Sequence, residues 1–352
     1  MRKSRVTVHD IANKAHVSTA TVSRALNNAG TVKTETKELI WAAAKELGYK
    51  IPVLSESPAE RPADSEIKEK TFLFPEKKII LIHITDISNP FYAEMIRGFD
   101  SSLTNSGIFD FLIYSKSITQ FNITQFLTMA EALHVVGMIT VNLTNNALLQ
   151  KISEKFPVVQ CGEFTDNPFA SSVGINDYTA TQQAIEYFLS MHRTKIAMVN
   201  GPLSYRYARD RLNAFKSITN SAGLNISPNW IIQLPELNHD MAFSSVVQLL
   251  NAADIPNCFF CVSDVLAAAT VRAVQYSNLR IPEDIMIIGF DNITLSQLTT
   301  PSITTVSQRK FQLGFIAGKL LIEKITNPLS EIKHIMLNTE LIVRESTSSH
   351  NA

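Results

Sequence analysis

The 352-residue chain is 45% hydrophobic and 18% charged, the composition of a folded globular protein long enough for two or more domains. Its formal net charge is zero, but residues 1–50 hold nine Lys and Arg against four Asp and Glu, so a basic head precedes an acidic body. Three cysteines do not suggest a disulfide framework, and we find neither a signal peptide nor the roughly 20 apolar residues of a membrane span. We therefore expect a cytoplasmic protein, with a basic head suited to nucleic acid.

The beginning of the chain predicts two short helices joined by a tight turn. Thr7, with Asp10 three positions later, is suited to cap the first helix, and Ser18 to cap the second. Apolar residues recur at helical spacing on both segments: Ile11, Ala12, Ala15, Val22, Ala25 and Leu26. Together with Val17 between them, they predict a small shared core, the pattern of a helix-turn-helix.

The second helix is expected to present small hydroxyl-bearing side chains and one arginine to solvent, a set that suits the DNA major groove. Thr19, Ala20 and Arg24 are the candidates for base edges, with Arg24 contacting a guanine or a phosphate. Contacts that fix the register on the DNA backbone are expected from Ser18, Thr21, Ser23 and Asn27. Thr7 and Lys33 complete the predicted DNA-binding set, and Lys33 either touches a phosphate or is merely solvated.

A third helix is predicted from Thr34 to Leu47, with Gly48 as its stop. Its expected buried stripe consists of Leu39, Ile40, Ala43, Ala44 and Leu47. We assign residues 1–50 to the DNA-binding head. Residues 51–76 mix four prolines with many charged side chains, a composition that cannot bury a core, and are predicted to be a linker.

From residue 77 onward, apolar runs alternate with amphipathic segments. Strands are predicted at residues 79–84, 109–114, 136–141, 157–160, 195–200, 231–233, 257–261 and 285–289. Helices are predicted at 91–105, 147–155, 178–191, 209–222, 240–251 and 265–276. Two successive β-α-β sets predict an α/β body of two lobes, each a parallel sheet with helices on both faces.

We place the first lobe at about 77–176 and 308–334, and the second at about 177–307 and 335–350. Ligands of such folds bind beyond the carboxyl ends of the strands, here in the cleft between the lobes.

Several segments together resemble the LacI/GalR family of repressors. Residues 17–27 are similar to the family's signature helix. Further matches follow in the family's order: Asn89-Pro-Phe-Tyr92, His192–Ile196, Gly201-Pro202, Arg211–Phe215, Cys261–Asp264, Ile281–Asp291, Pro301–Thr305 and Glu340–Arg344. The resemblance covers nearly the whole chain. It implies an all-α helix-turn-helix head on a two-lobed body of the periplasmic-binding-protein type (type I) that senses a small molecule.

Within the family, the chain resembles the cytidine-responsive branch at residues 18–26, 89–98, 289–297 and 340–344. Most of the family has a short hinge whose helix forms on DNA and inserts a leucine into the minor groove. Residues 52–61 keep only fragments of that pattern, as in the cytidine-responsive branch, so minor-groove wedging is not expected of this linker.

The resemblance places an effector in the cleft and implies its contacts. Phe91 is predicted either to stack on a sugar or base or to pack the helix start, and Arg211 either to hold a ligand or to form a surface salt bridge. Asp291 and Asp264 follow buried strands and are predicted to accept hydrogen bonds from hydroxyls, unless Asp264 caps the helix that begins at residue 265. Tyr205 stands where some relatives carry a ligand-binding arginine, which argues against a purine base.

Two other patterns carry less weight. Asn176 and Asp177 stand at the family's crossover between lobes, in the reverse of its Asp-Asn order. Cys258 and Cys261 form a C-x-x-C spacing, but residues three apart on a strand point to opposite faces, so we interpret them as packing residues.

No nucleophile elbow, phosphate loop, paired carboxylates or His ligand spacing is present, so we expect neither an enzyme nor a cofactor or metal site.

The sequence thus predicts a ligand-responsive transcriptional repressor that binds a palindromic DNA operator as a homodimer. The branch resemblance implies a cytidine-like nucleoside as effector, and a long linker through which the effector alters contacts with a neighbouring activator more than DNA affinity. A ribose- or hexose-responsive regulator of the same family is the alternative. A solute-binding receptor of the periplasmic type is a remote third.

Overall fold

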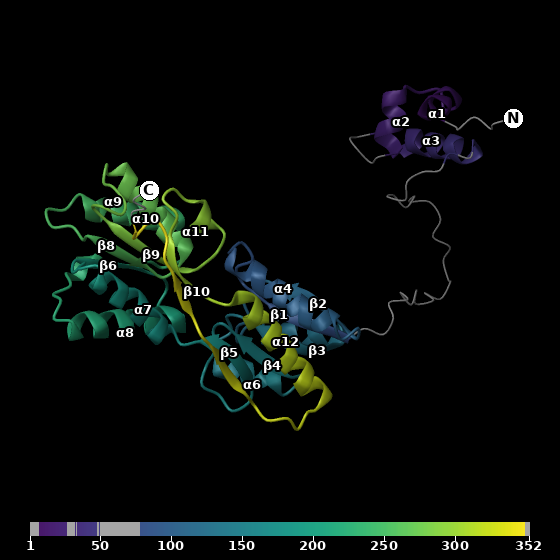
Figure 1. Ribbon diagram of the computed structural model, residues 1–352. Coiled ribbons are helices and arrows are strands. Elements are labelled where there is room, and N and C mark those ends of the chain that lie inside the picture. Colours follow the sequence, from purple (N-terminus) through teal and green to yellow (C-terminus); the bar gives the residue numbers. More distant parts are fainter. Residues whose placement is uncertain (1–6, 27–31, 33, 48, 50–77, 349–352) are drawn as a thin grey trace. The chain divides into compact units, whose positions relative to one another are not determined.

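The computed structural model describes residues 7–26, 32, 34–47, 49 and 78–348, and the chain divides into two compact units, residues 1–73 and 74–352 (Figure 1). Asn27, Lys33, Gly48 and the predicted linker at 51–76 lie outside the described residues.

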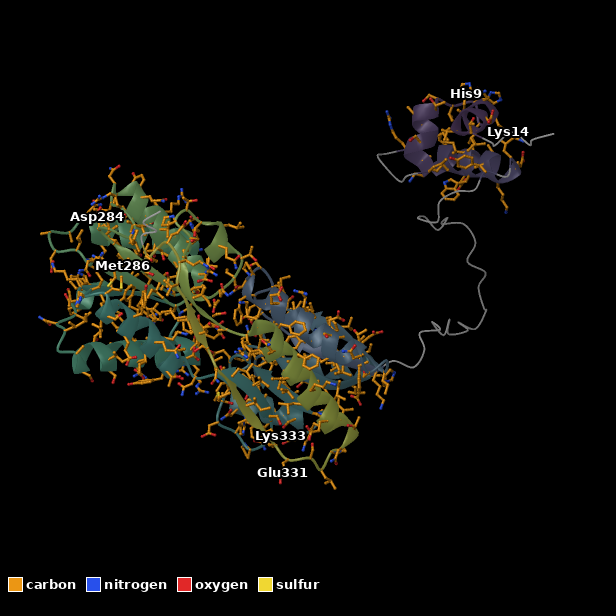
Figure 2. The ribbon with its side chains drawn as sticks, viewed as in Figure 1. His9, Lys14, Asp284, Met286, Glu331 and Lys333 are labelled. Atoms are coloured by element: carbon orange, nitrogen blue, oxygen red, sulfur yellow. The ribbon has the colours of Figure 1, made fainter. Side chains whose placement is uncertain are left out.

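The head consists of α1 (Val8–Lys14), α2 (Thr19–Leu26) and α3 (Thr34–Glu46) around a core of small and branched residues. Ile11, Val22 and Ile40 are fully buried, one from each helix, as the helical spacing predicts. Leu39 is an exception, because its side chain is 60% exposed and lies outside the buried stripe predicted for α3. Lys14 (labelled in Figure 2) lies at the end of α1, and it forms an ion pair with Glu46 at the end of α3.

The first lobe of the body is a six-stranded parallel sheet in the order β11-β5-β4-β3-β1-β2. Its strands are β1 (Lys78–His83), β2 (Phe109–Tyr114), β3 (Val135–Thr140), β4 (Val158–Cys161), β5 (Ser171–Ile175) and β11 (His334–Leu337). The helices α4 (Phe91–Thr104) and α12 (Lys310–Thr326) share an apolar cluster on one face, and α5 (Ile123–Ala132) and α6 (Asn146–Ser153) share a cluster on the other. This is the layered arrangement predicted for a parallel sheet.

Glycines allow α4 and α12 to lie against each other. A Cβ on Gly314 would overlap the carbonyl oxygen of Met95, and one on Gly98 would overlap that of Phe311. The backbones of the two helices therefore touch where these residues meet, and no larger residue fits at either position without movement of the helices.

The second lobe contains a six-stranded sheet in the order β12-β10-β9-β8-β6-β7, parallel except for β12. Its strands are β6 (Ile196–Asn200), β7 (Ile231–Gln233), β8 (Cys258–Cys261), β9 (Met286–Asp291), β10 (Thr304–Ser307) and β12 (Glu340–Ile342). The helices are α7 (Asp177–Ser190), α8 (Arg206–Ser221), α9 (His239–Leu250), α10 (Asp264–Tyr276) and the short α11 (Leu295–Leu298), with a 3-10 turn at Pro228–Trp230. Helices α7 and α8 pack together, as do α9 and α10.

The chain passes between the lobes three times, at β5 to α7, at β10 to α12 and at β11 to β12. The last passage comes later than expected. We placed residues 335–350 in the second lobe, but β11 pairs with β5 of the first lobe as far as Leu337. The sequence predicted neither β11 nor β12, because their residues are exposed or half-buried and form no buried apolar run.

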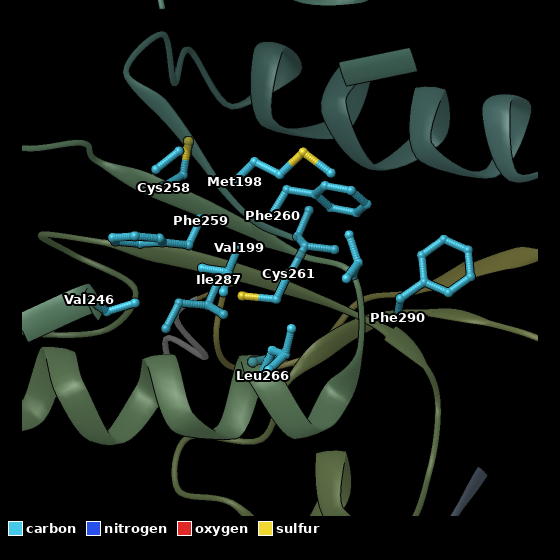
Figure 3. Packing of buried hydrophobic residues seen from close by; sticks show 14 of the residues in the cluster. Met198, Val199, Val246, Cys258, Phe259, Phe260, Cys261, Leu266, Ile287 and Phe290 are labelled. Atoms are coloured by element: carbon cyan, nitrogen blue, oxygen red, sulfur yellow. The ribbon is translucent and has the colours of Figure 1, made fainter. Parts of the chain in front are cut away.

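The core of the second lobe explains the C-x-x-C spacing. Cys258 and Cys261 extend to opposite faces of β8, with Cys261 on the same side as Leu266 of α10 (Figure 3). Both thiols are buried, and burial raises the pKa of Cys261 to about 12. They pack in the core, as the spacing predicted, and are poor thiolate nucleophiles.

Within the described residues, no helix is long and apolar enough to cross a membrane. The described residues also contain no group of three or more His, Cys, Asp or Glu that could hold a metal ion.

Candidate functional site

The first two helices of the head are held at their starts by side-chain caps. The Thr7 hydroxyl accepts a hydrogen bond from the Asp10 backbone N–H (3.4 Å), while the Asp10 carboxylate accepts one from the Thr7 backbone N–H (2.8 Å). The Ser18 hydroxyl accepts from the Thr21 backbone N–H (3.2 Å). In the turn between the helices, His16 has a φ of +51°, the left-handed conformation that a tight reversal requires. The predicted capping box is therefore present, and Thr7 and Ser18 each have a structural role.

The outer face of α2 carries the predicted major-groove residues. Thr19, Ala20 and Arg24 are exposed, and so is Ser23, whereas Thr21 is half-buried. Behind them Val22 and Ala25 are buried in the head core. One helix thus separates an apolar face that fixes its position from a polar face that is available to a partner.

The body contains a cavity of about 530 Å³ lined by both lobes, a volume typical of small-molecule sites. Its walls are formed mainly by residues that follow the carboxyl ends of β1, β3, β4, β6, β8 and β9. This is the place where open parallel sheets bind ligands. Of the predicted effector residues, Phe91, Tyr205, Arg211 and Asp291 line this cavity and Asp264 does not.

Asp264 lies behind the cavity wall, fully buried. Its carboxylate accepts hydrogen bonds from the Ile293 backbone N–H (2.8 Å) and the Thr305 hydroxyl (2.6 Å), which tie α10 to the segments around β9 and β10. Burial, with the nearby Asp291 carboxylate, raises the pKa of Asp264 to about 7. These contacts favour a structural role over a ligand role. The helix cap expected of it belongs to Ser263, whose hydroxyl accepts from the Leu266 backbone N–H.

Arg211 is buried rather than on the surface, with 4% of its area exposed. Its guanidinium donates to the Asp177 carboxylate (2.8 Å) and to the Val262 carbonyl (2.6 Å), and it lies 3.4 Å from the centre of the Phe290 ring. These contacts leave the planar group one fixed orientation at the cavity wall. The ion pair of Arg211 is thus buried and does not form the surface salt bridge that the sequence also allows.

Asp291 ends β9 with a φ of +106°, a backbone conformation that costs energy and is often retained at functional sites. Its carboxylate accepts a hydrogen bond from the Gln308 side-chain amide (2.8 Å). Burial raises its pKa to about 6, against the opposing effects of Arg211 and Lys310. The Lys310 ammonium donates to the backbone carbonyls of Asp291 and Asn292, which fixes the strained segment.

Aromatic rings from both lobes face the cavity. Tyr205 and Tyr207 of the second lobe are stacked, with ring centroids 5.6 Å apart and an interplanar angle of 18°. Phe91 and Tyr92 of the first lobe meet edge to face at 5.4 Å. Flat apolar faces on both sides suit a ring placed between them.

Four acidic residues that line the cavity lie outside the predicted site, and two of them bind other parts of its wall. Asp177 begins α7 and holds Arg211, while Glu163 follows β4 and accepts hydrogen bonds from backbone N–H groups at the start of α8. Burial raises the pKa of Glu163, and those two hydrogen bonds oppose the rise. The reversed Asn176-Asp177 pair was a signal for Asp177, whereas no pattern indicated Glu163.

The charge of the cavity follows from the charged side chains that line it. Its described lining contains five carboxylates and one cationic side chain, Arg211; the carboxylates belong to Asp86, Glu163, Asp177, Glu236 and Asp291. Because Asp177 already neutralises Arg211, the lining is anionic as a whole and rich in hydrogen-bond acceptors.

The head and the body each match a known protein family. Residues 7–51 match the model described as bacterial regulatory proteins, lacI family, and residues 185–347 match a periplasmic binding protein-like domain. The chain is 29% identical to the HTH-type transcriptional repressor CytR of Escherichia coli K12, over 98% of this chain and 97% of CytR. It is also 29% identical to the repressor PurR of Aliivibrio salmonicida, over 97% and 98% of the two chains.

Among solved structures, a LacI family transcriptional regulator from Enterococcus faecium with bound ribose is 26% identical, with a TM-score of 0.68. The match covers 77% of this chain and 99% of that structure. The relatives are repressors and not enzymes, and they match both the head and the body. The chain therefore combines a lacI family helix-turn-helix head with a periplasmic binding protein-like body: it is a DNA-binding transcriptional repressor with an effector-binding domain.

Proposed function

We propose that this repressor binds its operator with α2 in the major groove and is controlled by a neutral nucleoside in the cavity of the body. In this proposal the head at 1–50 binds DNA and the body at 77–350 binds the effector. The linker at 51–76 connects the two. A DNA-binding protein acts where its operator lies, so we place it in the bacterial cytoplasm, at the nucleoid.

On the head, we assign base contacts to Thr19, Ala20 and Arg24. The exposed face of α2 supports this assignment, because Thr19, Ala20 and Arg24 all lie on it. Backbone and phosphate contacts are assigned to the rest of the set, namely Thr7, Ser18, Thr21, Ser23, Asn27 and Lys33. A homodimer would place two such heads on a two-fold-related operator, and sedimentation of the full chain with operator DNA measures that stoichiometry.

The observation that carries the effector assignment is the combination of aromatic walls with an anionic lining. A base is accommodated between the Tyr205–Tyr207 pair and Phe91, and ribose hydroxyls find acceptors in carboxylates such as Asp291. A phosphate or carboxylate on the ligand would meet the surplus of negative charge and is disfavoured. The likeness to the cytidine-responsive branch, and a tyrosine at position 205, favour cytidine over a purine nucleoside.

A sugar is the second candidate. The same acceptors suit the hydroxyls of ribose or a hexose, and the Enterococcus faecium relative is described with bound ribose. A sugar would leave the flat face of the Tyr205–Tyr207 pair less completely covered than a nucleoside does. A solute-binding receptor gains no support, since such a protein has no use for the head.

Calorimetric titration of the full chain against cytidine, uridine, adenosine, ribose and glucose tests this assignment. We expect saturable heat from cytidine and weaker or no heat from the sugars. Binding of a sugar but of no nucleoside would contradict the proposal and establish the alternative.

The route from effector to DNA is also part of the proposal. Because a linker of 26 residues separates head and body, we expect cytidine to change operator affinity little in the purified protein and to act through a neighbouring activator. Operator binding measured with and without cytidine checks this, and a strong loss of affinity with no other protein present would contradict it.

A further inference from the structure

A carboxylate of the first lobe forms hydrogen bonds with the second lobe across the cleft. Glu163 lies on the loop after β4 in the first lobe, and its oxygens accept hydrogen bonds from the backbone N–H groups of Arg206 (2.8 Å) and Tyr207 (2.9 Å) in the second lobe. These are first-turn donors of α8 that no helical carbonyl satisfies, and the positive end of the helix favours a carboxylate. The side chain of Tyr205, the N-cap residue of α8, forms no capping hydrogen bond. The Glu163 carboxylate of the first lobe caps the helix instead.

A second contact across the cleft lies beside the first. The Arg206 guanidinium is 3.9 Å from the centre of the Phe164 ring, and the Asp210 carboxylate orients it from one turn further along α8 (2.9 Å). Residues 163 and 164 therefore hold the start of α8 through its backbone and through a side chain. These two kinds of contact are separable, because a substitution at Arg206 leaves its backbone N–H in place.

The start of α8 is also a wall of the effector cavity. Tyr205 and Tyr207 form the stacked aromatic pair there, and Arg211 follows one turn later. A contact that fixes the beginning of this helix against the first lobe thus fixes all three side chains relative to Phe91 on the other side.

We propose that Glu163 is a positioning residue for effector binding, which holds the two lobes closed by capping α8 from the opposite lobe. The inference rests on the proposed effector cavity but not on the identity of the effector. When the cap is removed, the open arrangement gains population, and the apparent affinity for any cleft ligand falls in proportion to the closed fraction.

Lobe closure can be measured directly on the full chain. All three native cysteines are buried, so Lys151→Cys on α6 and Lys216→Cys on α8, both at exposed positions, accept spin labels selectively. Pulsed electron resonance then gives the distribution of distances between the lobes without any effector. We expect one dominant short distance in the otherwise unaltered chain, and a ratio of short to long distances lower by about tenfold in Glu163→Gln. Its amide is uncharged and has one acceptor oxygen in place of the two that bind the N–H groups of Arg206 and Tyr207.

Asp166→Asn is the matched control, because Asp166 is exposed on the same loop and its replacement removes the same charge. It should leave the distribution unchanged, and Arg206→Ala, which keeps the capped N–H, should shift it less than Glu163→Gln does. Thermal unfolding of each variant confirms that it is folded.

Identical distributions for Glu163→Gln and the unaltered chain would overturn the proposal. An equal shift in Asp166→Asn or in Arg206→Ala would also overturn it, since charge or the guanidinium contact would then hold the lobes. Because no effector is present, none of these results depends on whether cytidine binds. A failure of the nucleoside assignment is therefore distinguishable from a failure of the cap.

Discussion

The head and the body of this repressor hold their functional side chains in different ways. On the head, Thr19, Ala20 and Arg24 stand exposed on one short helix, and the residues that keep that helix in place lie on its other face. In the body, Arg211 and Asp291 are buried, and each has partners that come from distant segments. The proposed DNA-contacting face can therefore change without a cost in stability, whereas the proposed effector cavity cannot.

Among the substitutions that test this difference between head and body, Arg211→Ala should have the largest effect. The substitution leaves the Asp177 carboxylate buried without its partner and should lower the free energy of unfolding of the body by about 3–5 kcal/mol. Effector binding should be lost with it. Denaturant unfolding and calorimetry measure both, and Lys216→Ala, an exposed position on the same helix, should cost about 0.5 kcal/mol or less. Equal stability of the two variants would contradict the account.

Arg24→Ala is expected to show the opposite pattern in the head. Loss of a guanine or phosphate contact should weaken binding to the preferred operator by about 1–3 kcal/mol, while the unfolding of the chain stays unchanged. Fluorescence anisotropy with operator DNA measures the affinity. Arg97→Ala, which removes an exposed arginine of α4 in the body, is the control and should leave DNA affinity as it was.

Buried carboxyl groups give the body a pH dependence that the exposed face of α2 lacks. Burial raises the pKa of Asp264 from 3.8 to about 7 and that of Asp291 from 3.8 to about 6. Both groups bind a proton more tightly in the folded state, so their stabilising contribution is complete below pH 3.8 and is lost as the pH rises through 6 and 7. Across that window we expect the free energy of unfolding to fall by up to about 1.4 kcal/mol per pH unit for each group.

Denaturant unfolding at a series of pH values measures this slope. Asp264→Asn should flatten it, and Asp240→Asn, which alters an exposed carboxylate of α9, should not. A slope that is the same in all three proteins would remove Asp264 from the explanation.

The smallest effect is expected at the Thr7 cap. Thr7→Ala removes the hydroxyl that accepts from the Asp10 N–H, at a cost of about 1 kcal/mol to the head. Amide hydrogen exchange in α1 should then be about fivefold faster, and exchange in the body unchanged. Asn13→Ala, at an exposed position of the same helix, should not speed exchange, because it removes no cap.

The contrast between head and body also decides how much the sequence could predict. The capping box at Thr7 and the two faces of α2 depend on neighbours within a few residues, and the structure has them as predicted. The long apolar strands of both sheets were equally visible, and so was the position of Asp291 at the carboxyl end of β9.

Contacts between distant segments were not predictable. Glu163 pairs with backbone N–H groups more than 40 residues away, and a backbone donor leaves no mark on the sequence. Asp264 looked like a cavity residue because it follows a strand, but the Thr305 hydroxyl and the Ile293 N–H hold it behind the wall. Tertiary packing decides whether a carboxylate faces a ligand or the protein interior. Local sequence patterns carry no information about that packing.

The sensor assignment rests on the anionic, aromatic cavity, and calorimetric titration of the full chain with cytidine and with cytidine 5′-monophosphate tests it most directly. The two ligands share base and ribose and differ only in the phosphate. We predict saturable binding of cytidine and affinity at least about tenfold lower for the monophosphate, whose charge meets the carboxylates around Arg211. Equal or tighter binding of the monophosphate would contradict the account.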